Sequence, residues 1–264
     1  MNNHEIDYRI IGEEMQYVEV ELDPNETAIA EAGSFMMMDE GIEMSTIFGD
    51  GSNAGPNTNF FGKLLSAGKR VLTGESLFMT TYTNVGQGKK HVSFASPYPG
   101  KIIPLDLMRL GGKVTCQKDS FLCAAKGVSI GIEFQRKLGT GLFGGEGFIM
   151  QKLEGDGMAF VHAGGHVLER ELMPGEVLKI DTGCVVAFTH GVSYDIQFVG
   201  GIKNTLFGGE GVFFATLRGP GKVWIQTLPI SRLAGRILAY GTYKRKEEGS
   251  ILGGLGNLLD GDGI

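Results

Sequence analysis

The sequence predicts an all-β protein built from three copies of one β module, and three observations lead to this prediction. The segments "GLFGGEGFIMQKLEGDG" at 141–157 and "TLFGGEGVFFATLRGPG" at 205–221 are nearly the same. The 43 glycines are roughly twice the usual share and end short apolar runs, where turns belong. Residues 14–227 lack the sustained i, i+3, i+4, i+7 apolar spacing of an amphipathic helix.

The repeat extends well beyond this segment. Sliding the chain against itself so that Gly100 meets Gly164 aligns 100–163 with 164–227 without a gap and gives sixteen identities. A longer slide places 20–48 on 170–198, which shares its E-L-x-P-x-E pattern. We therefore expect a triplicated domain over 1–227, with copies of a ~64-residue module in a pseudo-threefold arrangement, as a β-sandwich or β-prism. The expected copies are about 14–99, 100–163 and 164–227.

Each copy reads as short strands separated by tight turns. Segments such as "VLKIDTG", "CVVAFTHG" and "KVWIQTL" are rich in Val, Ile and aromatic residues and end at glycine or a turn signal. The first copy carries an additional Gly/Asn-rich insertion, "GDGSNAGPNTNFFG". Alternation along "FMMM" at 35–38 sends Met36 and Met38 to one side of a strand and Phe35 and Met37 to the other, which predicts core filling. The alternative is a soft-metal site or an adaptable partner surface.

The C-terminal residues 228–264 are predicted to lie outside the repeat. Ser231 is a candidate N-cap, and Leu233, Ile237 and Tyr240 share one face, which predicts a short helix over 230–240. The glycine-rich tail beyond it contains several leucines and is expected either to be loose or to dock on a neighbouring molecule.

The cysteines and the apolar runs limit the class of protein. Cys116, Cys123 and Cys184 show no C-x-x-C spacing, so we expect reduced thiols; a cross-strand disulfide on a hairpin joining Cys116 and Cys123 is the alternative. No apolar run reaches the roughly 18 residues of a membrane span, and the acidic N-terminus is unlike a secretory or transit peptide. A cytoplasmic protein without an integral membrane segment is expected.

Charge is distributed unevenly along the chain. Residues 1–48 contain twelve acidic side chains and one basic one, Arg9, whereas the chain as a whole has a net charge of −6. This acidic segment is expected to cover a basic face, either of the same molecule or of a neighbouring subunit. Basic residues occur singly and in pairs without interleaved aromatic residues, so nucleic-acid binding is not expected.

The combination of "ELMPGE", "DTG" and "LFGGEG" resembles the family named for altered inheritance of mitochondria, the mitochondrial biogenesis family of uncharacterised proteins. The resemblance covers the chain up to about residue 238. It implies a β fold like that of the tryptophan RNA-binding attenuation protein, present in triplicate. It implies no catalytic residue, because the family has none established.

The glutamates that follow a glycine in all three copies, Glu75, Glu146 and Glu210, are the first candidate site. Around a threefold axis they would converge and hold a hard cation or raise one another's pKa. The alternative is that each one accepts hydrogen bonds from its own glycine turn or pairs locally with a basic residue.

Two further motifs are weaker candidates. "HAGGH" places His162 and His166 just before Glu169 and Glu171, a set that suits a divalent metal across a strand, turn and strand; under the shorter slide, however, the histidines correspond to Gln226 and Ile102. "GTGLFG" at 139–144 matches the dinucleotide fingerprint but leads into a strand pattern, so no cofactor is expected.

Three functions follow from these patterns. The first is a non-enzymatic scaffold or binding protein that forms a homo-oligomer or binds a protein partner through sheet edges, the acidic segment or the tail. The second is a small-ligand-binding protein with a site at a boundary between copies. The third is a metal-dependent enzyme that uses the glutamates or the histidines.

Overall fold

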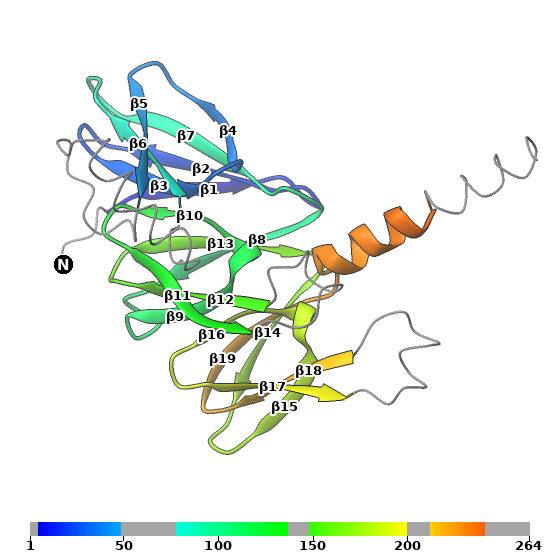
Figure 1. Cartoon of the computed structure of the whole chain (residues 1–264). Helices are drawn as coiled ribbons and strands as arrows, with labels where there is room; N and C mark the ends of the chain where they lie inside the picture. The colour runs from blue at the N-terminus through cyan, green and yellow to red at the C-terminus, as the bar shows by residue number, and fades with distance from the viewer. Residues whose placement is uncertain (1–4, 49–77, 137–147, 200–211, 241–264) are drawn as a thin grey trace, which may run out of the picture.

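The computed structural model describes residues 5–48, 78–136, 148–199 and 212–240, and within these ranges the chain is built almost entirely of strands (Figure 1). The predicted all-β class is confirmed. After β1 (Asp7–Ile11), the strands fall into three consecutive sets of six. Two short 3-10 turns, η1 (Lys118–Ser120) and η2 (Thr182–Cys184), interrupt the second and third sets.

The bounds of the strands are as follows. The first set contains β2 (Tyr17–Leu22), β3 (Thr27–Glu31), β4 (Phe35–Met38), β5 (Ile42–Phe48), β6 (Phe78–Asn84) and β7 (Lys90–Ala95). The second set contains β8 (Gly100–Asp106), β9 (Lys113–Gln117), β10 (Phe121–Ala125), β11 (Ser129–Arg136), β12 (Phe148–Glu154) and β13 (Met158–Gly164). The third set contains β14 (Val167–Leu172), β15 (Val177–Asp181), β16 (Val185–Thr189), β17 (Ser193–Val199), β18 (Val212–Arg218) and β19 (Gly221–Gln226).

The described strands form four antiparallel sheets, which we name A to D. Sheet A has the order β1-β2-β7-β4, and sheet D has the order β15-β18-β17. Sheet B has the order β5-β6-β3-β10-β13-β8, and sheet C has the order β11-β12-β9-β16-β19-β14. Sheets B and C therefore each combine three strands of one set with three strands of the next.

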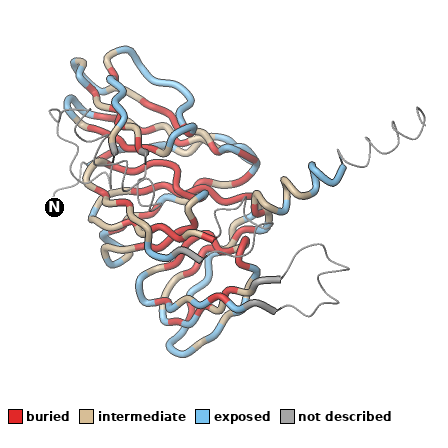
Figure 2. Tube along the Cα trace, viewed as in Figure 1, coloured by how far each residue is buried: buried red, intermediate tan, exposed pale blue. Residues whose placement is uncertain are grey.

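A separate hydrophobic core lies between each pair of neighbouring sheets. Val20 and Phe94 of sheet A pack with Phe160 of sheet B, and Leu105 of sheet B belongs to the same cluster as Leu153 of sheet C. Met150 of sheet C likewise belongs to the same cluster as Leu217 of sheet D. The sheets are thus stacked in the order A, B, C, D, and the buried residues concentrate in the middle of the stack (Figure 2).

The second and third sets share their strand positions and register. The offset that places Gly100 on Gly164 also places the first residues of β9, β10 and β12 on those of β15, β16 and β18, and the start of η1 on that of η2. The pairing of Ser129 with Glu154 has its counterpart, at the same offset, in that of Ser193 with Arg218. The superposition of three copies about a pseudo-threefold axis, and the likeness to the attenuation protein, stay predictions.

The short C-terminal helix is confirmed over residues 230–240, and it projects from the stack (Figure 1). Ile237 and Tyr240, on its predicted apolar face, are 63% and 73% exposed. None of the helices in the described ranges has the length and apolar character needed to cross a membrane.

Cys116 and Cys123 do not face each other on a hairpin. β9 and β10 are not paired with each other, because η1 turns the chain from sheet C to sheet B. Both thiols are buried and free, and Cys184 is also free. The alternative of a disulfide on a hairpin was therefore wrong, and the expectation of reduced thiols is met.

Candidate functional site

Two interstrand joints hold the three sets together. At the first joint, β10 of the second set pairs with β3 of the first, with Cys123 opposite Ala30. At the second joint, β16 of the third set pairs with β9 of the second, with Ala187 opposite Cys116. In each case, the third strand of a later set pairs antiparallel with the second strand of the preceding set.

At the two ends of the stack, the strands that correspond to those in the joints each have an unpaired edge. β4 is the third strand of the first set and pairs only with β7 among the described strands. β15 is the second strand of the third set and pairs only with β18 in the same part of the chain. The two strands lie at opposite ends of the molecule (Figure 1), so each has an edge on which backbone N–H and C=O groups face away from the sheet.

Burial separates the open strands from their counterparts in the joints. All five residues of β10 and four of the five residues of β16 are buried, whereas all four residues of β4 are exposed. β3 has four buried residues and β9 has four, whereas β15 has none. Figure 2 shows the same contrast between the buried middle and the exposed ends of the stack.

The prediction that "FMMM" fills the core was wrong. Phe35, Met36, Met37 and Met38 are 40%, 47%, 43% and 40% exposed. Phe35 stacks on Tyr82 at 5.5 Å, but no further strand within the described ranges lies beyond β4 to cover the methionines. Strict alternation does not hold either, because a bulge between Phe35 and Met37 shifts their register against β7. The sequence pattern also could not show that this strand is an edge.

A charged cluster lies directly beside β4. Asp39, the residue after β4, accepts a hydrogen bond from the backbone N–H of His91 at 2.8 Å and lies 3.1 Å from its Nδ1. The Nε2 of His91 lies 3.3 Å from Glu21, which also pairs with Lys89. The hydrogen bonds from His91 lower the pKa of Asp39, and the hydrogen bond from Lys89 is the main cause that lowers the pKa of Glu21.

A second polar contact fixes the end of β15. The Asp181 carboxylate accepts a hydrogen bond from Gly183 N–H at 2.8 Å and lies 3.6 Å from the guanidinium of Arg232. Arg232 belongs to the C-terminal helix, and it also donates to the backbone oxygen of Thr227 at 3.2 Å. The helix is thereby anchored close to the open edge of β15.

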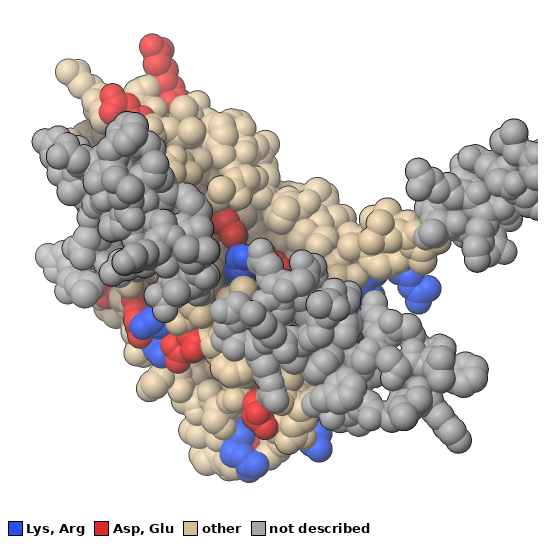
Figure 3. Space-filling view, in the orientation of Figure 1, with Lys and Arg blue, Asp and Glu red and all other residues tan. Residues whose placement is uncertain are grey.

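The acidic N-terminal segment is partly neutralised within its own chain. Glu19 pairs with Arg9 at 2.5 Å, and Glu14 lies 3.8 Å from Lys101 of the second set. On the face shown in Figure 3, the charged side chains visible at the end formed by the first set are acidic, whereas acidic and basic side chains are interspersed over the second and third sets.

Two titratable groups that are shielded from solvent lie at or near the first joint: half-buried Glu31 and buried His162. Burial, reinforced by the Asp119 carboxylate, raises the pKa of Glu31 at the end of β3 to about 7. His162 on β13 donates from Nε2 to the backbone oxygen of Tyr98 at 3.1 Å, and burial lowers its pKa to about 4. Its Nδ1 has no hydrogen-bond partner among the described atoms.

The predicted metal-site residues are not brought together in the described ranges. His162 is buried, whereas His166 is exposed and lies in the turn before β14. Glu169 instead accepts hydrogen bonds from Lys222 at 2.6 Å and from the indole N–H of Trp224 at 3.0 Å. The described residues contain no group of three or more His, Cys, Asp and Glu side chains that suits a metal ion.

The glutamate triad and the fingerprint motif cannot be placed. Glu75, Glu146, Glu210 and the "GTGLFG" segment all lie outside the described residues. Convergence of the three carboxylates therefore stays a prediction.

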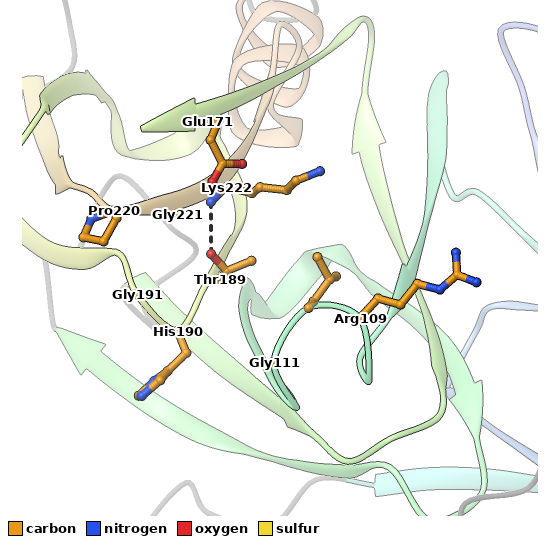
Figure 4. A pocket seen from close by; sticks show the side chains of 10 residues that line it. Arg109, Gly111, Glu171, Thr189, His190, Gly191, Pro220, Gly221 and Lys222 are labelled. Atoms are coloured by element: carbon orange, nitrogen blue, oxygen red, sulfur yellow. Dashed lines mark hydrogen bonds between the residues drawn. The ribbon is translucent and has the colours of Figure 1, made fainter. Parts of the chain in front are cut away.

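A pocket lies at the boundary between the second and third sets (Figure 4). It has a volume of about 410 Å³ and is lined by Arg109, Leu110, Gly111, Glu171, Thr189, His190, Gly191, Pro220, Gly221 and Lys222. Thr189 Oγ1 accepts a hydrogen bond from Lys222 N–H at 3.0 Å, which fixes one wall. Arg109 pairs with Asp106 at 3.1 Å, so its charge is already partly neutralised.

Comparisons with known proteins identify relatives without assigning an activity. The sequence model of the family described as Mitochondrial biogenesis AIM24 matches residues 8–228. An uncharacterised protein of Streptococcus pyogenes serotype M6 is 31% identical over 236 residues, which cover 87% of this chain and 89% of the relative. A crystal structure of a Streptococcus pyogenes protein has a TM-score of 0.69 and 25% identity, and the match covers 89% of this chain and 99% of that one.

Proposed function

The chain belongs to the Mitochondrial biogenesis AIM24 family, and from that premise we propose that it is a non-enzymatic scaffold that self-assembles through the open edges of sheets A and D. The observation that carries this proposal is the contrast between exposed β4 and β15 and their buried counterparts in the joints. An exposed apolar edge strand is a template for strand addition. We place this function in the triplicated domain of residues 1–227, in the cytoplasm, with residues 228–264 as an appendage.

The chemistry of β4 supports binding of a protein surface. Its three consecutive methionines are flexible and polarizable, which suits an adaptable contact. Met44 on β5, which is 54% exposed, adds to the apolar surface of the same set. Backbone hydrogen bonds along the edge would supply affinity, and the alternate side chains would supply specificity.

Light scattering at several protein concentrations tests this proposal. We expect the unmodified chain to have a mass above that of the monomer. Met37→Lys, which puts a charge on the edge strand, is expected to return it to the monomer. Met108→Lys is the matched control, because Met108 is 67% exposed and lies between β8 and β9, away from both edges. A monomeric mass for the unmodified chain at every concentration would rule out the scaffold.

The pocket between the second and third sets supports a second candidate, a small-ligand-binding protein. Its lining contains two basic side chains, Arg109 and Lys222, which pair with Asp106 and Glu169, and one acidic side chain, Glu171. A small polar metabolite with an anionic group is the favoured class. A thermal-shift screen with small carboxylates and phosphates tests this. A stabilisation that is kept in Lys222→Met would refute binding at this site.

A further inference from the structure

Sheets A and D are each organised like one half of sheets B and C. In sheet B, the half β5-β6-β3 comes from the first set and the half β10-β13-β8 from the second. In sheet C, the halves are β11-β12-β9 and β16-β19-β14. Sheet D, read as β17-β18-β15, has the connectivity of a first half, and β4-β7-β2 of sheet A has that of a second half.

Resting on the proposed function, we infer that the partner of each open edge is a second copy of this chain, which places its β4 antiparallel to β15 in a head-to-tail contact. Sheets D and A of two molecules then form one sheet of the order β17-β18-β15-β4-β7-β2-β1, in which the first six strands repeat the connectivity of sheets B and C. Because the two surfaces differ, the contact is heterologous and builds a ring or a filament.

The internal joints define the register of this contact. The bulge that puts Met37 opposite Ser93 in sheet A recurs where Cys123 lies opposite Phe160 in sheet B, so Met37 corresponds to Cys123. Ile180 is the residue that the repeat aligns with Cys116, its counterpart in β9. Cys123 faces Ala30 at the first joint, and Ala187 faces Cys116 at the second. Met37 holds the position of Cys123 and Ala187, so it lies opposite Ile180 of the neighbour. One residue further along β4, Met38 lies opposite Lys179.

Side-chain packing supports the same register. Cys123 of β10 belongs to the core between sheets A and B, which is the core of the preceding set. Ala187 of β16 likewise belongs to the core between sheets B and C. By the same geometry, Met37 extends the neighbour's core between sheets C and D, at whose rim Leu178 and Ile180 already pack. The contact thus covers the methionines that are 40–47% exposed in the single chain.

Cysteine cross-linking tests the register. The double variant Met37→Cys/Ile180→Cys, in a Cys184→Ser background, is oxidised and run on a denaturing gel. We expect a ladder of covalent multimers. Met37→Cys/Leu178→Cys is the matched control, because it shifts the pair by two residues along β15. Cβ atoms of directly opposite residues lie about 5 Å apart, whereas those of diagonal residues lie about 7 Å apart. Roughly tenfold less cross-linking is therefore expected for the control. Met38→Cys/Lys179→Cys provides a second in-register pair if the first variant fails to fold.

Other products would overturn this inference. A covalent dimer of the single variant Met37→Cys would indicate that β4 pairs with β4. An internally cross-linked monomer of the double variant would indicate closure within one chain. Assembly in light scattering without an in-register ladder would leave the scaffold standing but refute this partner and register. A chain that stays monomeric would refute both proposals.

Discussion

Glu31 and His162, two titratable groups at the first joint, are expected to affect stability in opposite directions over the same pH range. The second joint provides neutral replacements for both. Gln117 occupies the position in β9 that Glu31 has in β3, and the repeat aligns Gln226 with His162. We therefore predict the effects of Glu31→Gln and His162→Gln on the pH dependence of the free energy of unfolding.

For Glu31, the pKa is about 7 in the folded chain against an ordinary value of 4.5. The folded state therefore holds a proton that the unfolded state releases between these values. The free energy of unfolding falls as the pH rises from 4.5 to 7 and stays lower above that, by about 3 kcal/mol. Glu31→Gln removes this loss. The free energy of unfolding of the variant, relative to that of the parent, should therefore increase by about 3 kcal/mol as the pH rises from 4 to 8.

For His162, the pKa is about 4 in the folded chain against an ordinary value of 6.5. The unfolded state therefore binds the additional proton, and the free energy of unfolding falls as the pH drops from 6.5 to 4, again by about 3 kcal/mol. Between pH 4.5 and 6.5 the two groups oppose each other. In the parent chain, the combined contribution of the two groups to the free energy of unfolding should hardly change with pH over this range. In each variant, the free energy of unfolding should change with pH as the remaining group dictates.

Urea unfolding at half-unit pH steps measures these slopes. Trp224 is the single tryptophan of the chain and is 3% exposed, so its fluorescence reports unfolding. Groups common to parent and variant cancel when the two curves are subtracted. A difference between Glu31→Gln and the parent that stays constant from pH 4.5 to pH 8 would refute the assignment of a half-buried, protonated carboxyl at the joint.

Three further outcomes follow from the packing. Gly221→Ala should lower the free energy of unfolding by about 2 kcal/mol or more, because the φ of Gly221 is +140° and a Cβ would lie 2.5 Å from Thr189 Oγ1. Urea unfolding at pH 7 measures this effect, and an unchanged midpoint would contradict the prediction. Phe160→Ala, in the fully buried core between sheets A and B, should cost about 3–5 kcal/mol in the same assay, and a cost below about 1 kcal/mol would show that the core is not packed there. In the folded chain, Cys184 should react with a thiol reagent before the buried Cys116 and Cys123, whose pKa values burial raises; simultaneous reaction of all three would contradict the described core.

Local patterns were sufficient to predict the strands, the turns and the short helix. Segments such as "KVWIQTL" combine β-branched and aromatic residues with a bounding turn, and β19 ends at Gln226, inside that segment. The apolar spacing after Ser231 likewise led to the helix over 230–240, but the N-cap prediction was wrong. Ser231 lies inside the helix, and the Pro229 carbonyl accepts the hydrogen bond from the N–H of Leu233 at 3.2 Å. These features depend on neighbouring residues, whose periodicity is visible in the sequence.

Strand pairing was beyond the reach of the same patterns. β10 pairs with β3, which lies in the preceding set and far earlier in the chain, and no local periodicity encodes that choice. "FMMM" and "FLCAA" look equally suited to a core, yet the first forms an exposed edge and the second is buried. The Cys116 and Cys123 hairpin failed for the same reason, since a 3-10 turn and a tight hairpin turn have similar sequences.

Sheets B and C both cross the boundaries between the sets, and this has a consequence for folding. Removing one set would leave unpaired half-sheets on its neighbours, so no set retains its full complement of partners when separated from the others. The chain should accordingly lose its structure in one cooperative transition, and proteolysis between β13 and β14 should release fragments that aggregate rather than two stable domains.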